Sequence, residues 1–492
     1  MLFHKKCYTT HIACTILIIF TMCLRIQAGF SSERKDSIRV IIDFKTNSER
    51  SKILSYFKEA DITIHSHSIE ADTDWHHFFE MQHLGLNPAI QFEVARDSII
   101  NVNYLRLDNV YQILNDLRKE FPHIIKLDTI GFSTRELLPI LGVKLTNNKS
   151  LKLNKPAMLF TGLHHAKEIS SVEVCLYVLK HLCHNYESNQ HVRKFVDNIK
   201  IWFVPVVNPD GYRYILDEKG TQFYWRKNLS DNNSNSIFDP EFDGVDLNRN
   251  YDMNWDKDTN TNSSSFFYKG PYPFSESETF AIKQLTFREN FVLHLDYHSY
   301  GEIILYPWKN YPDVYNSGLI QSMALQMSQR IKRLNSDETY SIRPMDAQSG
   351  QCSNWMLAKA HVISFTIECG TSHFPTMDEL NSVVENCAQS AFYSLERILE
   401  SAVQGFVYDA IHNHPLRADI LINGSESNLV KNPQSNAYSG FFHILLQPGE
   451  YSLRIKADGY KPMVIENVII KEDNLTNLDI KLIKNDLLEI GN

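Results

Sequence analysis

A histidine and a glutamate three residues apart could bind one metal ion together. His165 and Glu168 stand in the sequence HAKE, where a predicted strand ends and a predicted helix begins. A loop in that place can turn both side chains toward one point, and such loops often carry functional residues. The pair alone is a weak signal. A catalytic zinc ion takes three protein ligands and leaves one position for water, so a third ligand must come from elsewhere.

The third candidate ligand is His298, near the end of the segment HLDYHSY. In a strand, His294, Asp296 and His298 point to the same face. Three polar side chains on one face of a buried strand need partners, because burying an unpaired polar group is costly. One interpretation is a hydrogen-bonded network in the core. The other is a strand that ends in a functional cleft.

Two further segments carry residues that are suited to act on a substrate. Glu368 ends an apolar strand that begins at Val362. A buried carboxylate there must be paired or functional, and a structural salt bridge is the alternative interpretation. Asn248 and Arg249 are adjacent in the sequence GVDLNRN. An amide and a guanidinium side by side on a loop can fork around a carboxylate.

These residues require a sheet that brings distant strand ends together. From Tyr104 to about Ala402, predicted strands alternate with helices, which is typical of a mixed or parallel α/β sheet. The pattern predicts strands at 156–163, 199–207, 291–298 and 362–368, an amphipathic helix at 169–184, and helices at 319–334 and 377–401. The almost wholly apolar strand at 199–207 is expected to be central. Ser275 and Glu278 have the spacing of a capping box, which predicts that a helix begins there.

Composition limits the class of protein. A chain of 492 residues, of which 43% are hydrophobic and 22% charged, indicates two or three soluble domains. The formal net charge of −9 argues against nucleic acid as a partner, because phosphate binding requires a basic surface. Lys5 and Lys6, followed by the apolar run Ile12–Leu24 and by Ala28, predict a signal peptide over residues 1–28 and a secreted or periplasmic location. An uncleaved membrane anchor is the alternative, and no later segment is apolar enough to span a membrane.

The cysteines leave the disulfide question open. Five remain after the predicted signal peptide: Cys175, Cys183, Cys352, Cys369 and Cys387. Their odd number means that at least one is free or pairs between chains. The absence of a CxxC pair argues against a cysteine-bound zinc ion. Neither the disulfide pairing nor the oligomeric state follows from the sequence.

Different patterns flank the alternating region. Residues 37–44 have the pattern of a strand and 49–60 that of a helix, which predicts a small α/β segment within residues 29–103. After Gly405, short alternating runs occur at 406–408, 418–422, 441–446, 451–455 and 478–482. They are separated by turn residues such as Pro448 and Gly449, which predicts a small all-β sandwich.

The motifs occur in a characteristic order: the HxxE pair, the arginine of YWRK, the NR pair, the His-Ser-Tyr segment and the final glutamate. In this order and spacing, the chain from Tyr104 to about Ala402 resembles the zinc carboxypeptidase family, the carboxypeptidase A-like peptidases. The resemblance implies a mixed eight-stranded sheet flanked by helices, with residues 104–402 as the catalytic domain. It also implies one zinc ion per chain and hydrolysis of the C-terminal bond of peptides or proteins.

The resemblance further implies a role for each matching residue. The implied zinc ligands are His165, Glu168 and His298. Glu368 would be the general base and proton shuttle, and Arg226 the cation that polarises the scissile carbonyl.

Other matching residues would bind the substrate or support the metal. Asn248 and Arg249 would hold the terminal carboxylate of the substrate, which limits cleavage to the last peptide bond. Tyr300 would line the substrate cleft. Asp246 is similar to the family's carboxylate that orients the first zinc histidine.

Two positions depart from the family pattern. The residue between the zinc histidine and glutamate is usually arginine, and here it is Lys167, a point charge instead of a planar fork. The mobile tyrosine that covers the substrate in the family lies four residues before the glycine of a Ser-Gly turn. In this chain Asp346 occupies that position before Gly350, which puts the covering role in doubt.

The pocket for the last substrate side chain is expected to include Ser353 and Lys309. Ser353 is small and neutral, which excludes the buried aspartate that binds basic ends. Lys309 could pair with a terminal Glu or Asp, which predicts a preference for acidic C-terminal residues. In the alternative, Lys309 faces solvent and the pocket is apolar.

The flanking segments have their own resemblances. Residues 403–492 resemble the transthyretin-like domain attached to some carboxypeptidases. Residues 29–103 resemble, more weakly, an activation propeptide, and a permanent accessory unit is the alternative.

Three functions compete. The first is an active carboxypeptidase. The second is a related amidase acting on bacterial cell-wall peptides. The third is a peptide-binding protein made inactive by the change at Asp346. The intact Glu368 favours an enzyme, since inactive relatives usually lose the base or a ligand.

Overall fold

A computed structural model describes most of the chain. It describes residues 104–149, 154–216, 224–258, 260–308, 317–345, 349–423, 427 and 429–485, and nearer the N-terminus five strands with Ser51 and Leu54. The chain divides into two compact units, Met1–Val102 and Asn103–Asn492. Among the described residues, no helix is long and apolar enough to cross a membrane.

The first unit contains a five-stranded sheet with the order β3-β4-β2-β1-β5. Its strands are β1 (Ile16–Phe20), β2 (Ile38–Asp43), β3 (Ile62–Ile64), β4 (Ser68–Thr73) and β5 (Pro88–Phe92). The strand predicted at 37–44 is therefore confirmed as β2. β1 comes from the apolar run assigned to the signal peptide, and it pairs with β2 and β5. The helix predicted at 49–60 lies outside the described residues, apart from Ser51 and Leu54.

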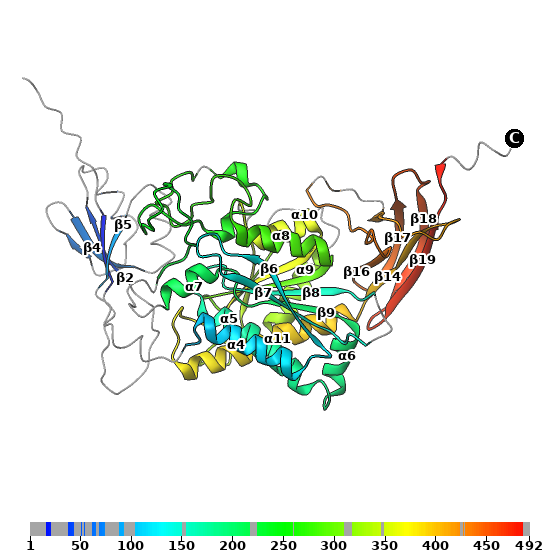
Figure 1. The fold of residues 1–492 in the computed structure, drawn as a ribbon, viewed down its shortest axis with the longest axis horizontal. Helices are drawn as coiled ribbons and strands as arrows, with labels where there is room; N and C mark the ends of the chain where they lie inside the picture. Colours follow the sequence, from blue (N-terminus) through cyan, green and yellow to red (C-terminus); the bar gives the residue numbers. More distant parts are fainter. Residues whose placement is uncertain are drawn as a thin grey trace, which may run out of the picture. The chain divides into compact units, whose positions relative to one another are not determined.

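The second unit is built on an eight-stranded mixed sheet, which confirms the predicted fold class. The strands are β6 (Ile125–Phe132), β7 (Pro139–Leu145), β8 (Ala157–Gly162), β9 (Lys200–Val204), β10 (Phe291–His298), β11 (Ile303–Tyr306), β12 (Ser341–Pro344) and β13 (Ile363–Glu368). Their order is β12-β11-β13-β10-β8-β9-β7-β6 (Figure 1). The four strands from β13 to β9 run parallel, and β9 lies inside the sheet as its apolar sequence predicts.

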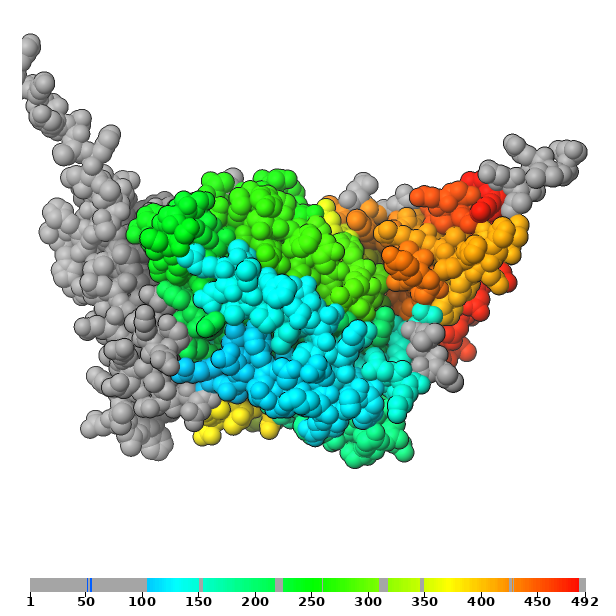
Figure 2. Space-filling view, viewed as in Figure 1, coloured from blue at the N-terminus to red at the C-terminus, as the bar shows by residue number. Residues whose placement is uncertain are grey.

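Helices cover both faces of this sheet. They are α4 (Leu107–Glu120), α5 (Ile169–Asn185), α6 (Gln190–Asn198), α7 (Pro209–Ile215), α8 (Ser277–Glu289), α9 (Ser317–Ser328), α10 (Cys352–Ala360) and α11 (Met377–Ile398). α5 and α11 pack against each other on one face, and α8 and α10 lie on the other (Figure 1). In the space-filling view, the segments coloured cyan to green form one continuous surface (Figure 2).

Two helix predictions need correction. The helix at 169–184 was expected to be amphipathic, but α5 is buried on most sides because it lies between the sheet and α11. The helix at 319–334 is shorter: α9 ends at Ser328, and Lys332 then pairs with Thr339 in a β-bridge.

The capping box predicted at Ser275 and Glu278 is wrong. α8 begins at Ser277, and its N-cap residue Glu276 makes no side-chain capping bond. The Ser275 hydroxyl instead donates to Glu276. The Glu278 carboxylate accepts bonds from the backbone N–H and the hydroxyl of Thr134, at 3.0 Å and 2.5 Å. Glu278 is fully buried, so it binds the 133–138 segment to the helix instead of capping it.

We expect this buried glutamate to make the protein less stable as the pH rises. Burial, and then the neighbouring Glu276 carboxylate, raise the pKa of Glu278 from 4.5 to about 8. Between these values the folded state holds a proton that the unfolded chain has released. The free energy of unfolding should therefore fall as the pH rises through this range, by up to about 5 kcal/mol.

The Glu278→Gln variant should lose this dependence, because its amide stands in for the protonated carboxyl. Urea unfolding at about pH 5 and about pH 9 measures the difference. Glu385→Gln removes an exposed carboxylate from α11 and should keep the wild-type dependence. A Glu278→Gln protein as sensitive to pH as the wild type would contradict this prediction.

The C-terminal part forms two further sheets, in agreement with the expected all-β character. One has the order β16-β14-β19 and the other β15-β17-β18. The strands are β14 (Ala402–Asp409), β15 (Asp419–Ile422), β16 (Phe441–Leu445), β17 (Gly449–Lys456), β18 (Met463–Ile470) and β19 (Leu475–Leu482). Strands from both sheets contribute to one apolar core. β18 was not predicted from the sequence. Asn467 has a left-handed backbone there and interrupts the alternation of buried and exposed residues.

Candidate metal centre and active site

The order of the parallel strands brings the candidate residues to one edge of the sheet. β10 lies between β8 and β13 and runs parallel to both. His298 pairs in register with Glu368, and Tyr297 with Gly162. Three residues after Gly162, the chain reaches His165. The carboxyl ends of neighbouring parallel strands are the common place for a functional site in an open α/β sheet.

The three residues predicted to bind zinc meet at one point. His165 Nδ1 lies 2.8 Å from one carboxylate oxygen of Glu168, and His298 Nδ1 lies 2.7 Å from the other. The two Nδ1 atoms are 3.1 Å apart. All three side chains are buried.

This set of atoms fits a zinc ion. Two imidazole nitrogens with a carboxylate form a known catalytic zinc ligand set. Zinc–nitrogen bonds of about 2.0–2.1 Å at tetrahedral angles separate neighbouring ligand atoms by roughly 3.3 Å. The observed separations are close to this value, so the three side chains already face a common centre.

A buried carboxylate and an arginine support the first histidine. Asp246 Oδ1 lies 3.2 Å from His165 Nε2, and Asp246 Oδ2 accepts a 3.0 Å bond from Arg226 Nε. Burial opposes it, but Arg226 and then His165 lower the pKa of the Asp246 carboxyl far below its ordinary value. Asp246 is therefore a carboxylate, able to accept the ring proton of His165.

Arg226 and Glu368 lie beside the three candidate ligands. Arg226 is largely buried, and its guanidinium is 3.9 Å from Glu168 Oε1. Burial raises the pKa of Glu368 to about 7, the charge of His298 opposes this rise, and that of Glu168 adds to it. A carboxyl whose pKa is close to neutral suits proton transfer in both directions.

Asn248 and Arg249 lie on the short 3₁₀ helix η1 (Leu247–Arg249), which Asp246 caps by accepting a bond from the Asn248 N–H. The Asn248 side-chain oxygen accepts from the backbone N–H of Cys352, at 2.8 Å. The guanidinium carbons of Arg249 and Arg226 lie 5.4 Å and 5.3 Å from the centre of the Phe267 ring. The two cations therefore flank one aromatic side chain.

The loop that carries Gly350 packs directly on this segment. The Gly350 N–H donates to Met253, and its carbonyl accepts from Tyr251. Its φ is +69°, and an added Cβ would lie 1.8 Å from the Arg249 carbonyl oxygen. Only glycine fits here, because a side chain would push the loop away from Arg249.

The remaining predicted residues divide into two groups. Tyr300 and Ser353 are described. The Tyr300 ring meets that of His373 edge-on at 4.8 Å, and the Ser353 hydroxyl lies 2.8 Å from that of Thr366. Lys309 and Asp346 lie outside the described residues. The predicted roles of all four stay predictions.

Lys167, the residue that departs from the family pattern, is buried in the site. Its ammonium group lies 5.3 Å from the centre of the Phe266 ring. Burial, and then the charge of Arg226, lower the pKa of Lys167 to about 7.

The sequence reading missed several residues that the fold brings to the site. His164, Thr161 and Tyr251 lie behind the candidate ligands, and His373 meets Tyr300. Thr161 and His164 precede His165 in the same segment, whereas Tyr251 and His373 come from distant segments that only the fold brings to the site. The five cysteines that follow the predicted signal peptide are all buried, and none of them forms a disulfide within the described part of the chain.

The comparisons with known proteins agree with this geometry. A family model described as zinc carboxypeptidase matches residues 110–390, which is more than half of the chain. The chain belongs to the zinc carboxypeptidase family. The family implies a zinc ion as cofactor.

Related proteins match over part of their length. Carboxypeptidase O of Bos taurus is 31% identical over 208 residues, 42% of this chain and 52% of that protein. A zinc carboxypeptidase of Saccharothrix mutabilis subsp. capreolus is 28% identical over 276 residues, 52% of this chain and 59% of that protein. An inactive metallocarboxypeptidase of Saccharomyces cerevisiae is 31% identical over 225 residues, 44% of this chain and 49% of that protein. The chain thus spans about half of the length of these relatives.

Solved structures share the fold. Carboxypeptidase A from Helicoverpa armigera superposes with a TM-score of 0.54 at 21% identity, and covers 72% of this chain and 95% of its own. Thrombin-activatable fibrinolysis inhibitor superposes with a TM-score of 0.56 at 17% identity, and covers 73% of this chain and 97% of its own.

Proposed function

We propose that this protein is an active zinc carboxypeptidase that removes the last residue of peptides or proteins. The observation that carries the proposal is the meeting of His165, Glu168 and His298 at one buried point, beside Arg226 and Glu368. Membership of the family supports the same reaction. One zinc ion per chain is proposed, because these three side chains together fit one ion.

Each residue has a chemical task in this proposal. Bound zinc would act as a Lewis acid and lower the pKa of coordinated water toward about 7. Glu368 would take the proton of the attacking water and pass it to the leaving amine. Arg226 would donate hydrogen bonds to the scissile carbonyl oxygen as its negative charge grows. Asn248 and Arg249 would bind the terminal carboxylate, which places the last peptide bond at the metal.

A second candidate is a zinc-bound protein that holds peptides without cleaving them. It is favoured by the relative named as an inactive metallocarboxypeptidase. This chain has both Glu368 and Arg226, which supports catalysis over peptide binding alone. No observation favours the amidase reading over the carboxypeptidase.

Peptide trimming tests these candidates directly. The purified full chain is incubated with a peptide library, with and without a zinc chelator, and the products are measured by mass spectrometry. We expect loss of single C-terminal residues that stops when the chelator is added. Peptide binding without trimming would favour the second candidate, and cleavage within cell-wall peptides alone would favour the amidase.

We further propose a preference for acidic C-terminal residues, set by Lys309. A charge that discriminates against a like charge is worth several kcal/mol in a desolvated pocket. Peptides ending in Glu, Phe and Lys should be cleaved in that order of decreasing rate, and Lys309→Ala should slow the Glu peptide at least tenfold, about 1.4 kcal/mol. If the wild type and the variant both cleave the Phe peptide fastest, Lys309 does not set the specificity.

The location and the flanking segments are part of the proposal. Lys5, Lys6 and the apolar run Ile12–Leu24 support export and cleavage near Ala28. N-terminal sequencing of exported protein tests this, and a chain that still starts at Met1 would count against it. We propose that residues 403–492 are a transthyretin-like domain, and that residues 29–103 are a propeptide or an accessory unit.

A further inference from the structure

A buried carboxylate lies behind the candidate metal ligand His298. His298 Nδ1 faces Glu168 and His165, so its other ring nitrogen, Nε2, points away from the metal centre. Nε2 lies 3.1 Å from Asp296 Oδ2. A ring nitrogen that binds a metal carries no proton, and the remaining N–H of such a histidine is usually donated to a carboxylate, a carbonyl or water. Asp296 is placed to accept it.

The other oxygen of Asp296 is held by two donors. Thr161 Oγ1 donates to Asp296 Oδ1 at 2.7 Å, and His164 Nδ1 lies 2.9 Å from the same oxygen. Asp296 is fully buried. A buried carboxylate that loses its donors pays a large desolvation penalty. Asp296 therefore cannot rotate away from His298 without breaking bonds that burial makes costly to lose.

His164 is fixed in turn from the far side. Its Nε2 lies 2.9 Å from the Tyr251 hydroxyl. Its ring is stacked almost parallel to the His298 ring, with the centres 5.7 Å apart and an angle of 13°. The chain of contacts thus runs from Tyr251 through His164 and Asp296 to the metal ligand.

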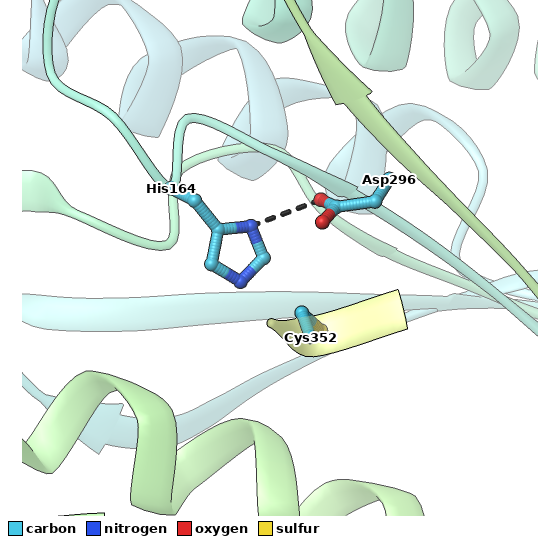
Figure 3. Close-up of side chains that lie close together, drawn as sticks. All are labelled: His164, Asp296 and Cys352. Carbon is cyan, nitrogen blue, oxygen red and sulfur yellow. Dashed lines mark hydrogen bonds and ion pairs between the residues drawn. The ribbon is translucent and has the colours of Figure 1, made fainter. Parts of the chain in front are cut away.

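His164, Asp296 and Cys352 also offer ligand atoms that lie within 4.8 Å of one another (Figure 3). A second metal ion could be imagined there. Both ring nitrogens of His164 and both oxygens of Asp296 already have partners within the protein. An ion would have to displace these bonds, so the group is better suited to hold His298 than to bind a metal itself.

We propose that Asp296 is a positioning residue for the metal ligand His298, and that His164 positions Asp296. This inference rests on the proposed metal centre. It gives His298 a carboxylate support of the kind that Asp246 gives to His165. The zinc affinity then depends on His164, a residue separated from the metal by Asp296 and His298.

Zinc affinity, measured by competition with a chelator on the full chain, tests the inference. Loss of a residue that supports a metal ligand typically weakens binding by about 10–100-fold. We expect this range for Asp296→Ala and a smaller loss for His164→Ala. In a protein that already carries Asp296→Ala, His164→Ala should add no further loss. Asp296→Asn keeps the shape of the side chain without its charge. It replaces Asp296→Ala in the test if the alanine variant does not fold. His164→Gln keeps a donor and should recover part of the affinity.

Tyr297→Phe is the matched control. Tyr297 lies between Asp296 and His298 on β10, points to the opposite face and bonds to Ser390 at 3.0 Å. Its loss should lower the melting temperature equally with and without zinc. The Asp296 variants should instead reduce the increase in melting temperature that zinc produces, because ligand-induced stabilisation depends on affinity.

The outcomes are distinct. Wild-type zinc affinity in both Asp296 variants would overturn the inference while leaving the proposed function intact. Additive losses from Asp296→Ala and His164→Ala would overturn the role of His164. Two zinc ions per wild-type chain, with one lost in Cys352→Ala, would make the group a metal site and overturn its positioning role. A wild-type chain without zinc affinity would refute the proposed function, and this inference with it.

Discussion

Replacing His298 with alanine is expected to remove zinc and peptidase activity together. His298 supplies one of three candidate ligands, and the other two, His165 and Glu168, are neighbours on a single loop. Without His298, nothing from β10 holds the ion. The loss of zinc affinity should exceed the roughly 10–100-fold typical of a residue that only supports a ligand. Metal content after dialysis and the rate of peptide hydrolysis measure the two effects.

Tyr297→Phe is the control for this variant. Tyr297 precedes His298 on the same strand, is equally buried, and bonds to Ser390 instead of to a candidate ligand. Its loss should lower the stability of the protein and leave the zinc content unchanged. Full metal occupancy in His298→Ala would show that the ligand assignment is wrong.

Glu368→Gln should keep zinc and peptide binding but lose hydrolysis. The amide preserves the size of the side chain and removes its ability to accept and return a proton. General acid–base groups typically contribute about 10²–10⁴-fold to the rate, so we expect a decrease of this size in kcat. Peptide affinity should change little, because the proposed carboxylate clamp lies on η1, in a different segment. Single-turnover kinetics with zinc-loaded protein separate the two quantities.

The matched control is Glu302→Gln. Glu302 is a partly buried glutamate four residues after His298, and it accepts a bond from the Leu334 N–H. This variant should hydrolyse peptides at nearly the wild-type rate. If Glu368→Gln stays within about threefold of the wild type, the base must be another residue.

The sequence predicted the helices and strands that have a clear pattern of apolar residues. Apolar runs identified β8, β9 and β13, β10 was predicted as a buried strand with three polar residues on one face, and the alternating runs identified most of the C-terminal strands. The patterns failed where tertiary packing overrides them. α5 is buried on most sides, and the carboxylate of Glu278 bonds to Thr134, 144 residues away, instead of capping its own helix.

The candidate metal ligands could be predicted from the sequence, but most of the residues that hold these ligands in place could not. His165, Glu168, His298 and Glu368 stand at strand ends, where sequence and topology agree. The polar face of β10 predicted either a core network or a cleft. The structure shows the network, and it reaches the candidate metal ligand, because Asp296 Oδ2 lies 3.1 Å from His298 Nε2. His164 and Tyr251 could not be paired from sequence, since 87 residues separate them.

The five buried free thiols allow local opening of this protein to be measured by chemical labelling. None of Cys175, Cys183, Cys352, Cys369 and Cys387 is accessible in the folded state. A thiol reagent can react with them only when the surrounding segment opens, so the rate of labelling measures the frequency of local opening. Cys352 begins α10 beside η1, and Cys369 directly follows Glu368, so these two report on the reaction centre. Cys183, near the end of α5, reports on the scaffold.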